Sequence, residues 1–160
     1  GTAERVMVKR IAPNTRGDGF RVGIVLSRFN APIGDGLLAG AQRALAECGV
    51  ADDDVTLVTV PGALETPLAL QRMAQTGEYE ALVALGAVIR GDTYHFEIVC
   101  NESAAGVSSV GLEFGIPIGN GILTCDTDAQ AEARMDQKGY EAVLAALEMA
   151  NLLQAIDDAD

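Results

Sequence analysis

His95 is the only histidine among the 160 residues of the chain, and it follows a segment whose residue types could bind an anion. An imidazole has an unperturbed pKa near neutrality, so His95 is the default candidate for a general acid or base. Before it, Arg90-Gly91-Asp92-Thr93 combines a cation, a flexible glycine and the free amides of a predicted helix start, which together suit a phosphate. Asp92 opposes that role by charge unless it caps the helix or pairs with His95. A lone histidine is more often structural, but the adjacent phosphate site favours proton transfer here.

Arg134 and Lys138 are two further candidate phosphate ligands, because cations are scarce in most of the chain. The net charge is −12, yet residues 1–28 are basic, and only five cations stand against 21 acids beyond them. Such an acidic body repels polyanions, so nucleic-acid binding is not expected. Arg134 and Lys138 flank a predicted polar break between the last two helices, where both could turn toward an anion. Without that scarcity they would be ordinary cations that complement helix dipoles.

Two other segments that follow predicted strands contain candidate ligand contacts. Phe29 is a large aromatic residue in Ser27-Arg28-Phe29-Asn30, and a flat heteroaromatic substrate could stack on it. It could equally pack as a hydrophobic staple on the next helix. In Pro61-Gly62-Ala63-Leu64-Glu65, Glu65 could accept hydrogen bonds from substrate hydroxyls. An acidic residue in a first helical turn is common, so this segment alone favours a structural role.

The apolar pattern predicts the elements that must position these residues. Strands are expected at 21–27, 55–60, 81–87 and 116–123, and helices at 33–48, 64–76, from about 93, at 128–134 and at 139–156. Strands that alternate with helices predict a parallel sheet covered on both faces, an α/β three-layer αβα sandwich of the flavodoxin-like type. In such sheets ligands bind beyond the carboxyl ends of the strands, and most of the candidate residues follow predicted strands.

Residues 1–20 fit no crossover and are predicted to form an N-terminal arm that packs on a neighbouring subunit, ahead of a single domain at 21–160. The 49% hydrophobic content exceeds what one small core buries, so a homo-oligomer is expected. No apolar run approaches the roughly 20 residues of a membrane span, and the start of the chain lacks a signal-peptide pattern. A cytoplasmic location without membrane contact is therefore expected.

The sequence argues against several kinds of site. The three cysteines are widely spaced, and with one histidine they cannot easily furnish a zinc site, so no metal is expected. The segment after the first strand lacks the glycines of a dinucleotide site, the Ser/Thr-rich loop of a flavodoxin and the acidic pair of a receiver domain. Walker A and G-x-S-x-G sequences are also missing. Nucleoside triphosphate hydrolysis and serine-esterase chemistry are therefore not favoured.

Four motifs, in their joint order, resemble the lumazine synthase family. They are Ser27-Arg28-Phe29-Asn30, the segment Val60 to Pro67, the segment Ala84 to Phe96, and Gly121-Ile122-Leu123-Thr124, within a resemblance that spans residues 21–156. The resemblance implies a transferase without a cofactor that acts in the penultimate step of riboflavin biosynthesis. It would condense 5-amino-6-(D-ribitylamino)uracil with 3,4-dihydroxy-2-butanone 4-phosphate to 6,7-dimethyl-8-ribityllumazine and release phosphate.

The resemblance also implies a set of site residues, with His95 as the catalytic proton carrier. The implied substrate-binding residues are Phe29, Gly62, Ala63, Leu64, Glu65, Val88, Ile89, Arg90, Gly91, Asp92, Thr93, Asn120, Arg134 and Lys138. Phe29 would stack on the pyrimidine ring, and Ala63 and Glu65 would hold the ribityl chain. Val88 and Ile89 would contact the ring, and residues 91–93 would bind the phosphate through their main chain. Arg134 of a neighbouring subunit would pair with that phosphate, within a homopentamer.

Two positions depart from the family pattern. Asn120 stands where many members have an aromatic residue, so the second face of the ring lacks that stacking partner. Three residues separate Arg134 from Lys138, fewer than is usual at a connection that influences the assembly of pentamers into shells. The choice between a pentamer and a larger shell stays open. Asn120 also leaves an alternative from another class, a weakly catalytic relative that binds flavins or lumazines or acts as a scaffold.

Overall fold

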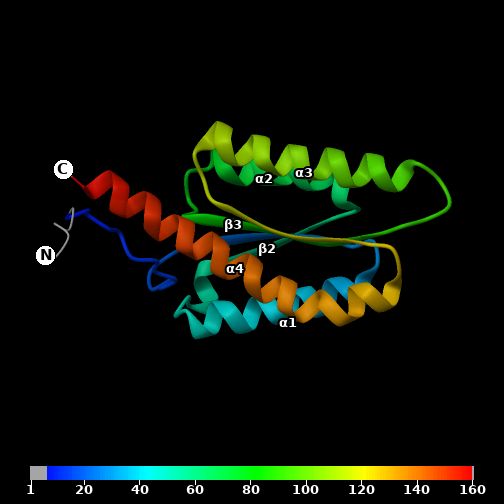
Figure 1. Ribbon diagram of the computed structural model, residues 1–160, viewed down its shortest axis with the longest axis horizontal. Coiled ribbons are helices and arrows are strands. Elements are labelled where there is room, and N and C mark those ends of the chain that lie inside the picture. The colour runs from blue at the N-terminus through cyan, green and yellow to red at the C-terminus, as the bar shows by residue number, and fades with distance from the viewer. Residues whose placement is uncertain (1–6, 160) are drawn as a thin grey trace, which may run out of the picture.

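The computed structural model describes residues 7–159, and these residues form a parallel sheet of four strands in the order β2-β1-β3-β4 (Figure 1). The strands are β1 Val22–Ser27, β2 Val55–Val60, β3 Ala81–Ile89 and β4 Ile118–Cys125. Val, Ile and Leu side chains favour these strands because they fit a sheet that is covered on both faces. The predicted α/β three-layer sandwich with a parallel sheet is confirmed.

Within residues 7–159, four α-helices cover the sheet, two on each face. α1 Ala31–Glu47 and α4 Asp128–Asp158 lie below the sheet in Figure 1, and α2 Thr66–Gln75 and α3 His95–Phe114 lie above it. Short 3-10 turns precede β2 at Asp52–Asp54 and α2 at Ala63–Glu65. Among the described helices, none is both long enough and apolar enough to cross a membrane.

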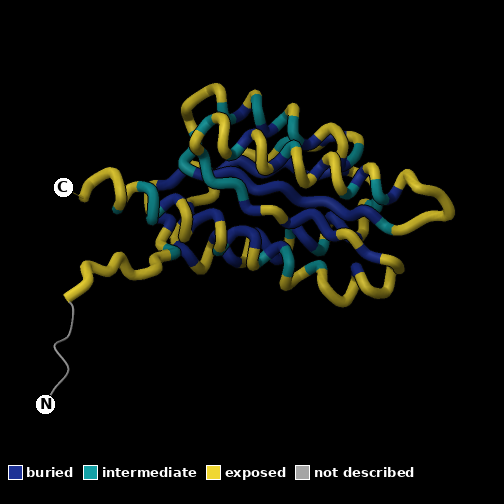
Figure 2. The backbone as a smooth tube through the Cα atoms, turned by 45° about the horizontal axis from the view of Figure 1, so that its top comes forward, coloured by how far each residue is buried: buried dark blue, intermediate teal, exposed yellow. Residues whose placement is uncertain are grey.

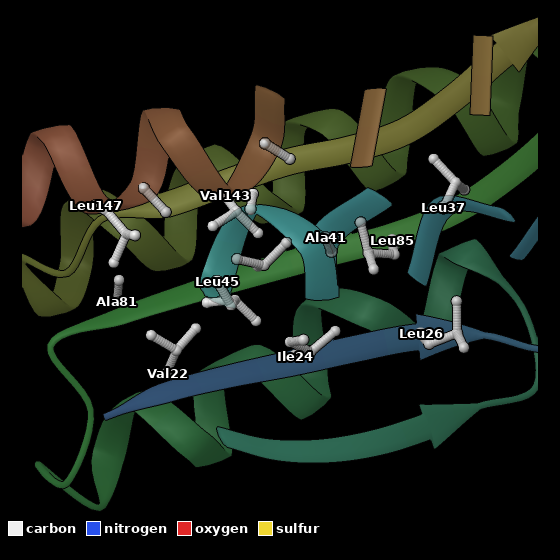
Figure 3. Packing of buried hydrophobic residues seen from close by; sticks show 14 of the residues in the cluster. Val22, Ile24, Leu26, Leu37, Ala41, Leu45, Ala81, Leu85, Val143 and Leu147 are labelled. Carbon is white, nitrogen blue, oxygen red and sulfur yellow. The ribbon is translucent and has the colours of Figure 1, made fainter. Parts of the chain in front are cut away.

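β1 is buried along its whole length, so helices enclose the middle of the sheet (Figure 2). Val22, Ile24 and Leu26 belong to the cluster that also contains Leu37 of α1 and Leu147 of α4 (Figure 3). Val25 of β1 belongs to the opposite cluster, beneath α2 and α3. Close packing on both faces holds the carboxyl ends of the strands in fixed positions.

α4 is a single helix of 31 residues, so the predicted break between helices at 128–134 and 139–156 is wrong. The polar residues of the supposed break lie on the exposed and half-exposed sides of a continuous helix. Asp136 accepts a hydrogen bond of 2.6 Å from Arg43 of α1, and the Arg43 guanidinium stacks on Tyr140 at 4.3 Å from the ring centroid. These contacts tie the segment to α1, and tertiary packing overrides its weak local preference.

Gly40 of α1 and Gly139 of α4 allow the two helices to touch backbone to backbone. A Cβ atom on Gly40 would lie 2.0 Å from the carbonyl oxygen of Asp136, and one on Gly139 would lie 2.0 Å from the carbonyl oxygen of Leu37. A glycine in a helix interior costs about 1 kcal/mol relative to alanine, and the close packing offsets that cost here. These two glycines therefore set the distance between α1 and α4.

Residues 7–20 form neither helix nor strand, and residues 1–6 of the predicted arm lie outside the described residues. The later part of the arm is attached to α4, because Asn151 Nδ2 donates to the carbonyl oxygens of Asn14 and Arg16 at 2.8 Å each. Before this attachment, Met7 and Val8 expose large apolar side chains.

We expect Gly40→Ala to lower the free energy of unfolding by about 1–3 kcal/mol, the usual cost of overpacking, although alanine is the better helix former. The clash involves a backbone carbonyl, which cannot move unless α1 and α4 separate. Gly36→Ala on the same helix is the matched control, because its added Cβ meets only atoms of the flexible Met135 side chain. Urea denaturation at one protomer concentration measures both variants. Equal midpoints would contradict the proposed backbone contact.

Candidate active site

A pocket of about 300 Å³ opens at the carboxyl ends of the strands. β2 lies on one side of β1 and β3 on the other, so the chain leaves the middle of the sheet in opposite directions at this edge. Such a switch point is where α/β sheets bind ligands. The lining comes from the ends of the strands and the start of α3: Phe29, Gly62, Ala63, Leu64, Glu65, Ala87, Val88, Ile89, Gly91, Thr93, His95, Phe96 and Val99.

The structure therefore brings most of the predicted site residues into one pocket, from His95 and Phe29 to the segments at 62–65 and 88–89. Sequence reasoning missed Ala87, Phe96 and Val99. Phe96 and Val99 are both buried and lie three residues apart on the first turn of α3, an apolar spacing that indicates a covered helix face. That spacing could have identified them as a wall of the pocket.

Phe29 is 72% exposed and lines the pocket, so it is not a buried staple on α1. Asn30, which follows it, has φ 60° and ψ 54°, a left-handed conformation that asparagine tolerates better than most residues. This turn separates the aromatic ring from the helix that begins at Ala31. Asn30 Nδ2 also donates to the Ala87 carbonyl oxygen at 3.4 Å, which joins the turn after β1 to the carboxyl-terminal part of β3.

The second wall of the pocket is the 3-10 turn Ala63–Glu65. The N–H group of Glu65 donates to the Gly62 carbonyl oxygen at 3.2 Å. Ala63 is buried, whereas Leu64 and Glu65 are exposed. Because the Glu65 carboxylate is exposed at the rim, it is free to accept hydrogen bonds from the hydroxyl groups of a ligand.

The connection between β3 and α3 projects beyond the sheet at the end opposite the termini (Figure 1), and residues 90–95 are exposed (Figure 2). The backbone N–H of His95 donates to Thr93 Oγ1 at 3.4 Å. Tyr94 is the N-cap of α3 and makes no side-chain capping bond. Asp92 is therefore not the N-cap, and the described residues contain no hydrogen bond between Asp92 and His95. The amides at the start of this long helix can still attract an anion.

Arg90 lies outside the pocket lining, because two carboxylates hold its guanidinium. Its Nε donates to Asp126 Oδ1 at 2.7 Å, and its Nη1 donates to Glu97 Oε1. Hydrogen bonds to Asp126 and then Glu97 raise the pKa of Arg90, and the hydrogen bond from Arg90 lowers the pKa of Glu97. Arg90, which the sequence predicts to bind a phosphate, is instead bound to the carboxylates of Asp126 and Glu97.

Arg134, Lys138 and Asn120 lie away from the pocket within one chain. Arg134 and Lys138 line a separate hollow between the end of β4 and the first turns of α4. Arg134 Nη1 donates to the Gln130 carbonyl oxygen at 2.9 Å, and neither cation forms an ion pair within residues 7–159. Asn120 lines another hollow, between the ends of α3 and α4, and its Oδ1 accepts from the Ile122 N–H at 3.0 Å.

The fold and the pocket define an α/β enzyme whose site lies at the carboxyl edge of a parallel sheet. Residues 19–154 match the family described as 6,7-dimethyl-8-ribityllumazine synthase. A protein of that name from Cupriavidus metallidurans is 59% identical over 144 residues, which cover 90% of this chain and 85% of the relative. Another, from Burkholderia vietnamiensis, is 57% identical over 145 residues, which cover 91% of this chain and 86% of the relative. The chain belongs to the 6,7-dimethyl-8-ribityllumazine synthase family, as its motifs predicted.

We expect Asn30→Ala to destabilise the protein by about 1–2 kcal/mol relative to Asn30→Gly, because only the alanine forces a β-carbon into the left-handed region. Both variants lose the hydrogen bond to the Ala87 carbonyl, so the comparison isolates the backbone strain at the pocket. Urea midpoints measured side by side provide the test. If the alanine variant were as stable as the glycine variant, residue 30 would not need the left-handed conformation.

Proposed function

We propose that the protein condenses 5-amino-6-(D-ribitylamino)uracil with 3,4-dihydroxy-2-butanone 4-phosphate, giving 6,7-dimethyl-8-ribityllumazine, inorganic phosphate and water. The observation that carries this proposal is a single pocket lined by the exposed Phe29 ring, by Gly91 and Thr93 of the loop before α3, and by His95 at the start of that helix. One part of the pocket suits a flat ring and the other an anion. The relatives named above carry the name of the enzyme that makes this product.

Each wall of the pocket would hold a different part of the substrates. Phe29 stacks on the pyrimidine ring, and the adjoining ends of Val88 and Ile89 contact the ring edge. Glu65, exposed at the rim beside Ala63, accepts hydrogen bonds from the ribityl hydroxyls. The main chain of residues 91–93 binds the phosphate of the four-carbon substrate near the start of α3.

The chemistry requires no nucleophile from the protein. The amine of one substrate attacks the carbonyl of the other, so the imine forms between the two substrates and one water leaves. Elimination then releases inorganic phosphate, and the second amine closes the ring on the remaining carbonyl carbon with loss of a second water. The protein contributes alignment and proton transfer, and His95 is the group in the pocket suited to move protons near neutral pH.

The phosphate needs a cation that one chain does not supply to its own pocket. No lysine or arginine is among the described residues that line it, and Arg90 is held by two carboxylates. Arg134 has no carboxylate partner within residues 7–159 and lies in a hollow on the surface. We therefore assign Arg134 to the pocket of a neighbouring subunit, with Lys138 nearby, in a cytosolic homopentamer.

Exposed apolar side chains around the pocket support such an interface. Leu64 lines the pocket and is 43% exposed; Ile98 of α3 is also 43% exposed, and Leu68 of α2 is 66% exposed. Exposed apolar side chains that lie together mark interaction surfaces. The N-terminal arm, with Met7 and Val8 exposed, would pack on the adjacent subunit, and Asn120 would face that subunit's ligand.

A steady-state assay with both substrates tests the proposed reaction. Formation of the lumazine, followed by its absorbance, together with release of inorganic phosphate in equal amounts, would support the enzyme. A protein that binds the lumazine but produces none would instead be the binding or scaffold relative that Asn120 suggests. Failure to bind either substrate would remove the pocket from consideration.

We expect His95→Ala to assemble and bind the lumazine while its turnover falls by about 10²- to 10⁴-fold, the usual contribution of a general acid or base. Alignment of the substrates persists, so the reaction should slow rather than stop. Steady-state rates of both proteins, with assembly checked by light scattering, measure this. Identical rates would make His95 a structural residue.

We expect a mixed assembly of His95→Ala and Arg134→Ala subunits to be far more active than an assembly of either variant alone. In a ring with shared sites, about a quarter of the sites in an equal random mixture would combine both intact residues. The subunits should be denatured together, refolded and tested for mixing by mass spectrometry before the assay. Mixed pentamers without recovered activity would place Arg134 and His95 in the same chain's site or exclude Arg134.

A further inference from the structure

Arg90 stands directly before the loop of residues 91–95, and the sheet fixes the start of its side chain. Its backbone N–H donates to the Cys125 carbonyl oxygen at 2.9 Å, which extends the pairing of β3 with β4 by one residue beyond Ile89. The Cα atom of Arg90 therefore belongs to the rigid sheet, and its side chain leaves from a defined point.

The guanidinium of Arg90 connects three elements. It donates to Glu97 in the first turn of α3 and to Asp126 between β4 and α4, and its carbon atom lies 4.3 Å from the centroid of the Phe96 ring. Two carboxylates against one cation leave this cluster with a negative charge, which disfavours direct contact with a phosphate. The geometry suits a connection within the protein better than an anion site.

The partners of Arg90 are themselves held in place. Gln130 Oε1 accepts from the backbone N–H of Asp126 at 2.8 Å, and the Gln130 N–H donates to Thr127 Oγ1 at 3.1 Å. This reciprocal pattern is close to a capping box at the start of α4. Phe96 is 9% exposed and forms part of the pocket wall. Arg90 therefore binds to groups that are held by other parts of the fold, which limits the movement of its guanidinium.

The loop between these attachments has little support of its own. All of residues 91–95 are exposed, and the Thr93–His95 hydrogen bond is the one side-chain hydrogen bond recorded for them. The Arg90–Glu97 pair joins the two flanks of this loop, which restricts the conformations that it can adopt. Restricting a loop before the ligand binds reduces the ordering that binding must otherwise supply.

We propose that Arg90 is a positioning residue that ties the loop of residues 91–95 to α3 and α4, so that the loop amides and the His95 imidazole keep one orientation toward the pocket. Arg90 acts through Glu97, Asp126 and Phe96 and does not touch the phosphate. This inference rests on the proposed function for its ligand, the phosphate of the four-carbon substrate. It differs from the sequence-based expectation, in which Arg90 itself binds the anion.

Neutral substitutions on the two sides of the pair test the proposal. Arg90→Gln, Glu97→Gln and the double variant are compared with the unmodified chain for binding of inorganic phosphate by calorimetry. The kcat and the KM for the phosphorylated substrate are measured with the same proteins. We expect each single variant to weaken phosphate binding and to lower kcat/KM by about 10-fold or more, because small displacements of positioning groups have effects of this size. The double variant should resemble Arg90→Gln, since Glu97→Gln removes one of the contacts that Arg90→Gln already breaks.

The competing roles predict different results. If Arg90 contacts the phosphate directly, Glu97→Gln removes a competing carboxylate and phosphate binding stays equal or becomes tighter, which would overturn the proposal. If Arg90 only stabilises the fold, phosphate binding and kcat/KM stay unchanged, which would also overturn it. Arg90→Lys covers the case in which Arg90→Gln does not fold. It keeps one charge but cannot reach two carboxylates as a planar fork does, so an intermediate loss is expected, and full activity would contradict the proposal.

Arg43→Gln is the matched control. Arg43 also pairs with two acids, Glu47 and Asp136, and its guanidinium carbon lies 4.3 Å from the Tyr140 ring centroid, but it lies on α1 away from the pocket lining. Its kinetics and phosphate binding should match the unmodified chain. Phosphate binding measured by calorimetry needs no turnover, so it tests the positioning role of Arg90 separately from the proposed function. Unmodified protein that binds phosphate through an intact loop but makes no lumazine would reject the function and retain the positioning role.

Discussion

The parallel pairing of β1 with β3 joins the two strands at the middle of the sheet, in a register that runs from Val22 opposite Ala81 to Leu26 opposite Leu85. Both strands are buried from two sides, so neither can shift without exposing a core. Since every strand in the sheet is parallel, this pairing also sends all the carboxyl ends to one edge. The position of the pocket follows from that arrangement before any site residue is considered.

The pocket is lined by buried residues of the packed scaffold on one hand and by exposed side chains on the other. The carboxyl end of β3 and the buried Phe96 form a fixed wall, whereas Phe29, Glu65 and His95 are exposed to solvent. This division is typical of enzymes in which a packed scaffold positions chemical groups on loops. The proposed roles of the cations correspond to this division, with Arg90 positioning the loop of its own chain and Arg134 assigned to the pocket of a neighbouring subunit.

Patterns of residue type were sufficient to predict the strands, the layers and most of the pocket, because each depends on apolar periodicity or on the topology of parallel sheets. The continuity of α4 could not be predicted in the same way, since it depends on contacts of Asp136 and Gly139 with α1 that lie far away in the sequence. Arg90 illustrates a related limit. Arg90 is one of the few cations beyond residue 28, which made it a candidate phosphate ligand. Only the fold brings Glu97 and Asp126 to its guanidinium.

The backbone contact of Gly40 and Gly139 has a consequence for motion. Packed helices in many enzymes slide past one another by small amounts when a ligand binds, but here each helix places a glycine against a carbonyl oxygen of the other. Sliding would bring residues that carry a Cβ atom against these carbonyl oxygens in place of Gly40 and Gly139. The layer of α1 and α4 therefore resists shear and behaves as one rigid slab beneath the sheet.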